Sequence, residues 1–211
     1  MMQLAAIWRY PVKSMRGESL ETAALTPDGI AGDRTIQVFD GRDRLVTART
    51  HPALLGHLGG IGPAGEPTVD GHHWTAPEAR AVIEQAVGAG AHFGRNDGRR
   101  FDVLPLLVAT DGALEEFGRD ARRLRPNLII SGVPGLQERE WEGRRLQIGA
   151  AVIFLDDLRG RCVMTTFDPE TMAQDPEVLR DIVRRFDGNL CLNASVITPA
   201  QVAIGAPVQL V

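Results

Sequence analysis

The stretch Arg145-Leu-Gln-Ile-Gly-Ala-Ala-Val-Ile-Phe-Leu155 is the clearest indication of how this chain folds. Residues 145–148 and 151–155 are mostly apolar, and only Gly149-Ala150 separates them. Two such runs joined by a two-residue turn are typical of a β-hairpin. A similar corner follows at Val202–Ala206, where Val-Ala-Ile-Gly-Ala resembles the Leu-Gln-Ile-Gly-Ala of the hairpin.

The rest of the chain also consists of short apolar runs between turns. The 23 glycines and 13 prolines favour strands and turns over long helices. We expect strands near residues 3–9, 20–25, 35–39, 45–47, 105–109, 128–130, 190–197 and 207–210. We expect helices near residues 52–58, 77–87, 111–117 and 176–186. The sequence therefore predicts a β-rich α+β protein, with a barrel that closes its own edges and a few peripheral helices.

The composition excludes several classes of protein. Hydrophobic residues make up 44% and charged residues 24% of the 211, as in ordinary globular proteins. The formal net charge of −4 argues against a general nucleic-acid or anionic-membrane binder. No apolar run could cross a bilayer, and Met1–Tyr10 lacks the layout of a signal peptide. We expect a cytoplasmic protein without nucleic-acid or membrane partners.

Several familiar motifs are absent or stand in the wrong context. Gly60–Gly65 matches G-x-G-x-x-G, but Pro67 and a polar run follow where a dinucleotide site needs a helix. We therefore interpret residues 59–67 as a surface loop. The histidines form no H-E-x-x-H motif, and two cysteines cannot build a zinc ribbon or an iron–sulfur cluster.

The segment Arg159-Gly-Arg-Cys-Val-Met-Thr-Thr-Phe-Asp-Pro169 points to chemistry. Cys162 follows two arginines, and nearby positive charge favours the thiolate that soft metals bind. A semi-buried structural cysteine is the alternative interpretation. Cys191 differs, because it lies in the apolar run Leu-Cys-Leu and is expected in the core.

Four other loops carry basic or polar side chains at strand ends: Tyr10–Ser14, Gly29–Arg34, Leu45–Arg49 and Arg125–Asn127. Each could be a solvated turn. Together they could form an anion cradle, because lysine, arginine, serine and loop N–H groups converge on phosphate in such sites. Lys13 is the sole lysine among 23 basic residues, which fits either codon bias or a need for a compact ammonium there.

These motifs, in this order, resemble the MOSC family, named after the C-terminal domain of molybdenum cofactor sulfurase. The resemblance covers nearly the whole chain and is closest to members with an added N-terminal β-barrel domain, including the mitochondrial amidoxime-reducing component and its bacterial relatives. It implies a MOSC-type β-barrel, similar to the pyruvate kinase barrel. It also implies an N-terminal MOSC β-barrel domain over residues 1–95 and a MOSC domain over residues 96–211.

The resemblance assigns roles to individual residues. It implies that Cys162 is catalytic and ligates the metal of a molybdenum–molybdopterin cofactor. The implied cofactor-binding positions are Lys13, Ser14 and Arg34, particularly at the phosphate, and Arg125, Asn127, Gly160 and Arg161.

Some positions depart from the family pattern or have no assigned role. Some relatives carry serine at the position of Gly160, where only a backbone contact is expected, and a Thr-Ser pair where this chain has Val103-Leu104. Four further motif residues could be purely structural: Arg49, Thr165, Thr166 and Asp168.

The resemblance implies a molybdenum-dependent oxidoreductase that removes an oxygen atom from small N-hydroxylated substrates. Because the chain has no iron–sulfur cysteines, its electrons would come from a separate reductase or carrier. The alternative is a non-enzymatic sulfur or molybdenum-cofactor carrier that uses Cys162 as a persulfide or thiolate. A third hypothesis is a decayed site in the same fold, against which the retained Lys13 and Arg161-Cys162 pair argue.

Overall fold

A closed β-barrel forms the centre of the computed structural model, which describes residues 1–96, 98 and 100–211. An eight-stranded sheet runs in the order β17-β13-β14-β15-β11-β12-β1-β2. β11 and β12 pair in parallel, and the other neighbours in this sheet pair antiparallel. The strands are β1 (Gln3–Arg9), β2 (Glu18–Leu20), β11 (Leu106–Thr110), β12 (Leu128–Ser131), β13 (Arg145–Ile148), β14 (Ala151–Gly160), β15 (Asn189–Thr198) and β17 (Val208–Leu210).

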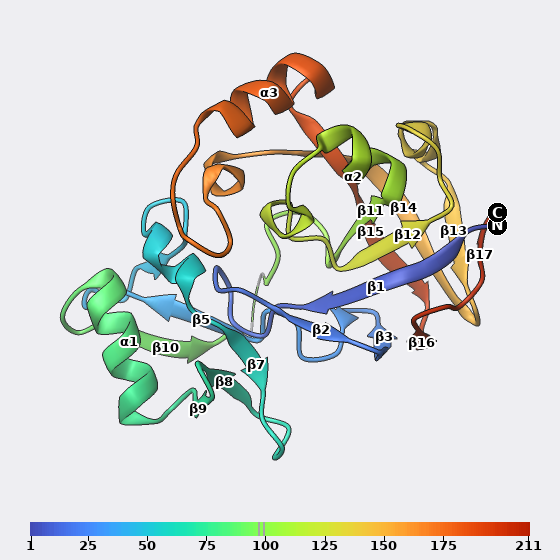
Figure 1. Ribbon diagram of the computed structural model, residues 1–211. Helices are drawn as coiled ribbons and strands as arrows, with labels where there is room; N and C mark the ends of the chain where they lie inside the picture. Colours follow the sequence, from blue (N-terminus) through green and yellow to red (C-terminus); the bar gives the residue numbers. More distant parts are fainter. Residues whose placement is uncertain (97, 99) are drawn as a thin grey trace.

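The barrel closes where the two ends of the chain meet (Figure 1). Gln3 in β1 forms an antiparallel bridge with Pro207, just before β17. The Leu4 N–H donates to the Ala206 carbonyl at 3.0 Å. Closure removes free strand edges from the ring. The β-rich α+β barrel predicted from the sequence is therefore confirmed.

The predicted hairpin is present as β13 and β14, with a turn at Gly149. Gly149 has a φ of 56°, a left-handed conformation that glycine adopts at little cost. β14 does not end at Leu155, as the apolar run suggested. The strand continues to Gly160, because β15 keeps pairing with it across two register shifts after Leu155. This extension places Arg159 at the site described below.

Three small sheets lie beside the barrel (Figure 1). Their strands are β3 (Thr22–Thr26), β4 (Gly29–Ile30) and β16 (Ala200–Ala203); β5 (Ile36–Phe39), β6 (Leu45–Val46) and β10 (His92–Arg95); and β7 (Gly59–Ile61), β8 (Pro67–Val69) and β9 (His72–His73). The prediction that residues 59–67 form only a loop is wrong, because their ends pair as β7 and β8. A Cβ on Gly59 would lie 3.2 Å from Val12, so this glycine allows close backbone approach.

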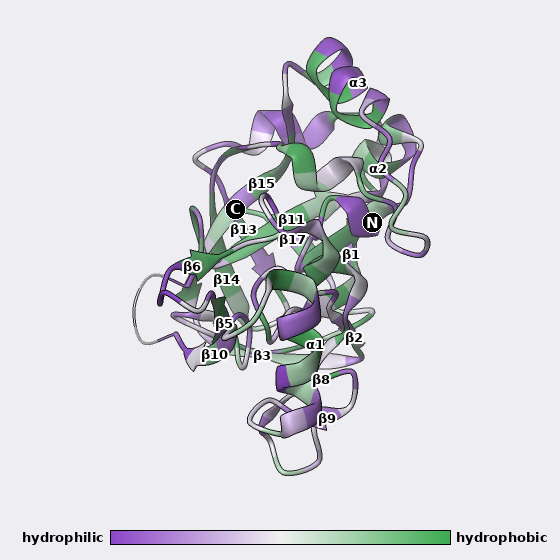
Figure 2. Cartoon of the chain, turned by 90° about the vertical axis from the view of Figure 1, so that its left-hand side faces the viewer, coloured by the Kyte–Doolittle hydropathy of each residue, from purple (hydrophilic) through white to green (hydrophobic). Residues whose placement is uncertain are grey.

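Short helices pack on the outside of the barrel and over the small sheets. The α-helices are α1 (Pro77–Val87), α2 (Asp111–Phe117) and α3 (Glu177–Phe186), and the 3-10 helices are η1 (Pro52–Gly56), η2 (Ala121–Arg123), η3 (Gln137–Trp141) and η4 (Val163–Thr166). Figure 2 shows hydrophobic and hydrophilic residues on both α1 and α3, as expected of surface helices. Ile182 and Phe186 of α3 pack with Phe117 of α2 against the outside of the barrel.

Two main cores organise the molecule. The barrel core combines early residues such as Leu4 and Ile7 with later ones such as Leu146 and Leu192. A second core is formed by buried residues between Val12 and Ala91 and lies under α1. We call the part of the molecule built around this second core the lobe. The predicted domain boundary between residues 95 and 96 stays a prediction. Among the described residues, no helix is both long and apolar enough to span a membrane.

Candidate functional site

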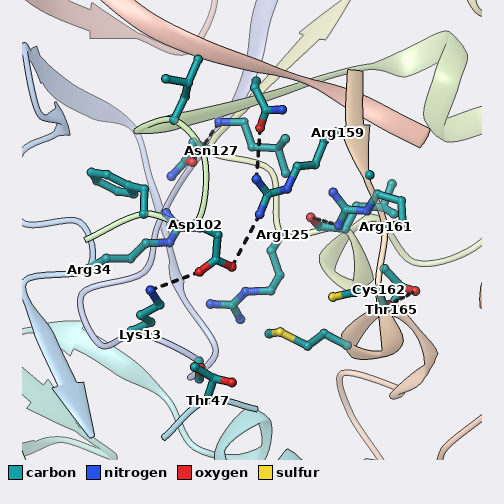
Figure 3. A pocket seen from close by; sticks show the side chains of 18 of the residues that line it. Lys13, Arg34, Thr47, Asp102, Arg125, Asn127, Arg159, Arg161, Cys162 and Thr165 are labelled. Carbon is teal, nitrogen blue, oxygen red and sulfur yellow. Dashed lines mark hydrogen bonds and ion pairs between the residues drawn. The ribbon is translucent and has the colours of Figure 1, made fainter. Parts of the chain in front are cut away.

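One pocket is lined by every residue that the sequence analysis assigned to cofactor or metal (Figure 3). We call it the Cys162 pocket; its volume is about 130 Å³. Loops from the lobe and the ends of barrel strands both contribute to its wall. The assigned residues in this wall are Lys13, Ser14, Arg34, Arg125, Asn127, Gly160, Arg161 and Cys162.

Cys162 stands where β14 gives way to the 3-10 helix η4 and is a partly exposed free thiol. Its carbonyl accepts both the N–H of Thr165 at 3.0 Å and the hydroxyl of the same residue at 2.9 Å, which holds the turn. Hydrogen bonding to Asp102 raises the pKa of Arg49, and the nearby Cys162 sulfur acts in the same direction. The Arg49 guanidinium therefore lies within interaction distance of the Cys162 sulfur.

Cys191 behaves as the sequence predicted. Its side chain is buried beneath α3, and burial raises the pKa of its thiol to about 11. It forms no disulfide with Cys162. The two cysteines thus have opposite environments, and only Cys162 faces the pocket.

Asp102 places a carboxylate among the basic side chains of the pocket, and the sequence analysis did not identify it. Its oxygens lie 3.2 Å from the Lys13 ammonium and 3.6 Å from the Arg159 guanidinium, and also bond to Arg49. Burial opposes ionisation of Asp102, but the bonds from Arg49 and Lys13 outweigh it and lower the pKa to about 2. Figure 3 shows this carboxylate between Lys13 and Arg159. The cluster of cations thus already holds one anion.

The Lys13-Ser14 loop is fixed by bonds to three other segments of the chain. Lys13 N–H donates to the Ile36 carbonyl at 2.8 Å, and its ammonium donates to the Arg100 carbonyl at 3.2 Å. Ser14 has a φ of 72°, and its hydroxyl oxygen accepts the Ala48 N–H at 3.0 Å. The sole lysine of the chain therefore points its charge into the pocket.

A second carboxylate, Asp33, is buried and bonds to two of the cofactor candidates, Arg34 and Asn127. It accepts the Tyr10 N–H at 2.6 Å and the Asn127 amide at 3.3 Å, and it pairs with Arg34. Asn127 also donates to the Trp8 carbonyl at 3.1 Å. The Asn127 amide hydrogens are thus used within the protein, so this residue supports the pocket from behind.

Two guanidinium groups lie on the ring of Tyr10. The Arg125 carbon is 4.3 Å and the Arg34 carbon 4.9 Å from the ring centre. Burial lowers the pKa of Arg125 to about 10, and no ion pair to Arg125 occurs in the part of the chain that the structure describes. Its charge is stabilised by the ring face, which leaves its N–H groups for a ligand.

Arg161 and Gly160 complete the wall beside the thiol. Arg161 donates one guanidinium N–H to the Leu124 carbonyl at 2.6 Å, while its buried Nε has no partner among the described residues. A Cβ on Gly160 would come no closer than 3.7 Å to Asn189, so the wall has room for a larger residue there.

The remaining motif residues mostly shape the turn after Cys162. Asp168 pairs with Arg123 at 2.8 Å and accepts the N–H groups of Glu170 and Thr171. Leu104 lines the pocket, whereas Val103 is 47% exposed on the surface. No group of three or more His, Cys, Asp or Glu side chains gathers as a metal site within the described ranges.

The barrel fold and two matching family models identify this chain as a MOSC protein. Residues 1–57 match the MOSC N-terminal beta barrel domain and residues 110–209 match the MOSC domain, so the chain belongs to the MOSC family. It is 22% identical to mitochondrial amidoxime reducing component 2 of Macaca fascicularis, over 87% of this chain and 72% of the relative. Mitochondrial amidoxime-reducing component 1 of Mus musculus is 23% identical, over 82% and 67% of the two chains.

A solved structure shares the fold at much lower sequence identity. The YUAD protein from Bacillus subtilis superimposes with a TM-score of 0.53 at 14% identity, covering 100% of this chain and 96% of that one. This likeness supports the fold alone.

Proposed function

We propose that this protein binds the molybdenum cofactor through Cys162 and reduces N-hydroxylated compounds. The supporting observation is that a partly exposed free thiol shares one pocket with Lys13, Arg34, Arg125 and Arg161. MOSC domains are associated with the molybdenum cofactor, and the curated relatives are named for amidoxime reduction.

The residues present fit such a cofactor. A soft metal takes a thiolate ligand, which Cys162 offers, and a phosphate takes cationic donors. Asp102 acts as a protein-borne stand-in for an anion, because three basic side chains already converge on it. The Arg161 Nε, for which the described residues offer no partner, is a further donor in the same wall.

Each residue has a distinct part in this proposal. Cys162 would ligate the metal, Lys13 and Arg34 would bind the phosphate, and Arg125 and Arg161 would donate hydrogen bonds. When bound, the cofactor supplies a metal centre that exchanges electrons in pairs. The chain's own residues hold it in place, and Arg49 lies beside the Cys162 sulfur.

The overall reaction breaks the N–O bond of the substrate. With two electrons and two protons, R–NHOH becomes R–NH₂ and water. A separate reductase or carrier would supply the electrons, and solvent would supply the protons. The partial exposure of Cys162 leaves the metal position open to small substrates.

The test compares wild type, Cys162→Ser and Cys191→Ala, each purified from a host that makes the cofactor. We expect stoichiometric molybdenum and benzamidoxime reduction, with an added electron donor, in wild type and Cys191→Ala. We expect Cys162→Ser to lose both the metal and the activity while its melting temperature stays close to that of the cofactor-free wild type, because the replaced atom is small and partly exposed.

Two results would count against the proposal. If Cys162→Ser reduces the substrate as fast as wild type, Cys162 is not the ligand. If wild type carries a Cys162 persulfide by mass spectrometry and no molybdenum, the protein is a sulfur carrier.

A further inference from the structure

A second pocket adjoins the Cys162 pocket and shares only Arg125 with the residues proposed to hold the cofactor. We call it the Trp8 pocket; its volume is about 440 Å³, within the roughly 300–1,000 Å³ range of small-molecule sites. Arg123, Arg125 and Met164 line both pockets and form the wall between them. A ligand in the Trp8 pocket would therefore lie next to the proposed cofactor.

The body of the Trp8 pocket is apolar and partly aromatic. Its apolar lining consists of Trp8, Tyr10, Leu55, Leu58, Met164 and Phe167. Leu58 is 42% exposed at the mouth, whereas Leu55 and Tyr10 are buried further in. Such a lining favours a flat hydrocarbon body, because aromatic faces stack and bury large areas.

Most charges around the pocket cancel in pairs. Arg123 pairs with Asp168 at 2.8 Å, and Glu18 pairs with Arg9 at 2.8 Å. Arg122 pairs with Asp120 at 2.6 Å and also with Glu170. These pairs leave Arg16 and Arg125 to set the net charge of the pocket.

Arg16 and Arg125 have no carboxylate partner in the described part of the chain. The Arg16 Nε is buried and makes no hydrogen bond among the described residues, and Arg125 rests on the Tyr10 ring. The terminal N–H groups of Arg16 also make no hydrogen bond among the described residues, so a ligand oxygen in the pocket could accept from them. The two guanidinium groups therefore give the lining of the pocket an excess positive charge.

We propose that the Trp8 pocket binds a small carboxylate with a flat apolar body, its carboxylate on Arg16. The reacting group of a substrate would then point across Arg125 and Met164 toward Cys162. Only the identification of this ligand as the substrate rests on the proposed function. If the ligand is the substrate, the preferred substrates are N-hydroxylated acids with an aromatic body.

Binding is measured by calorimetry with 2-naphthoate and its neutral analogue 2-naphthamide, on cofactor-free and cofactor-loaded protein. We expect 2-naphthoate to bind both forms and 2-naphthamide to bind at least about tenfold more weakly, since a charge-assisted hydrogen bond contributes about 1.5–3 kcal/mol. Arg16→Gln should weaken 2-naphthoate about tenfold and leave 2-naphthamide unchanged. Arg42→Gln, an exposed control, should bind like wild type.

Leu58→Glu is a second variant that keeps the test decisive if Arg16→Gln unfolds. Its new carboxylate at the exposed mouth should repel 2-naphthoate but not 2-naphthamide. Equal binding of acid and amide, or no binding of either, would overturn the proposal. Binding of 2-naphthoate to the cofactor-free protein but not to the cofactor-loaded protein would also overturn it. The cofactor would then occupy the pocket.

An activity measurement separates this inference from the proposed function. With an aromatic N-hydroxylated acid as substrate, Arg16→Gln should raise KM about tenfold and change kcat little. If the protein carries no molybdenum, the proposed function fails while the 2-naphthoate result still stands. If KM is unchanged in an active enzyme, the Trp8 pocket is not the substrate site.

Discussion

At the residue scale, the carboxylate of Asp102 pairs with the basic side chains of the Cys162 pocket when no cofactor is bound. It is 3.2 Å from Lys13 and also holds Arg49 and Arg159, which come from separate segments. Without this carboxylate, like charges would face one another in a partly buried site, at an energetic cost. An incoming phosphate must therefore compete with Asp102 for the same donors.

We therefore predict that Asp102→Asn binds inorganic phosphate more tightly than wild type. Removing one negative charge a few ångströms from the site should improve affinity about tenfold. Calorimetry on cofactor-free protein checks this, with the exposed Asp43→Asn as the control. Weaker binding by Asp102→Asn would show instead that Asp102 holds the cations in position.

At the element scale, the buried side chain of Glu138 in the 3-10 helix η3 bonds to Thr110, the residue that caps helix α2. The Thr110 hydroxyl accepts the Ala113 N–H at 3.2 Å and caps α2, and it donates to Glu138 at 3.1 Å. The other Glu138 oxygen, Oε1, has no partner among the described residues. Burial raises the pKa of Glu138 above its ordinary value of 4.5.

This raised pKa makes stability depend on pH in a defined direction. The folded state binds the Glu138 proton more tightly than the unfolded state, so the contribution of that proton is complete below about pH 4.5. It falls as pH rises from there through the raised folded pKa. Above that pKa the folded state holds a buried charge without full compensation.

We predict that Glu138→Gln gains stability over wild type as pH rises. The two proteins should be nearly equal at pH 4, and the variant should be more stable at pH 8 by about 1 kcal/mol or more. Urea unfolding across this pH range measures the difference. Glu140→Gln, exposed on the same 3-10 helix, should give a curve parallel to that of wild type. A parallel curve for Glu138→Gln would contradict the prediction.

At the scale of the whole molecule, the barrel depends on contact between the two ends of the chain. The bridge of Gln3 to Pro207 and the Leu4 N–H bond to Ala206 join β1 to the segment before β17. Leu4 is fully buried in the core that late strands share. Damage at the first strand should therefore destabilise the entire barrel.

We predict that Leu4→Ala lowers the free energy of unfolding by roughly 2–5 kcal/mol. Leu45→Ala, the same change at a position that is 47% exposed, should change it by less than about 0.5 kcal/mol. Urea unfolding followed by far-UV circular dichroism and by tryptophan fluorescence gives both values. A loss at Leu4 no larger than at Leu45 would show that barrel closure adds little stability.

Much of the local structure was predictable because it depends on neighbouring residues. Helix α1 has the predicted bounds, and the hairpin of β13 and β14 lies where the apolar runs and glycine turn placed it. Residues 59–67 were misread, since glycines that usually mark loops here allow close strand packing. The continuation of β14 beyond Leu155 was missed because it depends on pairing with β15.

The sequence alone determined the family and the candidate residues: one cysteine among arginines, one lysine, and motifs in the order of the MOSC family. Only the tertiary structure decided that Lys13 and Cys162 share a pocket, that Asp102 lies among its cations, and that a second pocket adjoins it. The physical reason is the separation along the chain between the residues that interact. Side-chain periodicity reports which local face is buried, whereas the meeting of distant loops depends on how the barrel closes.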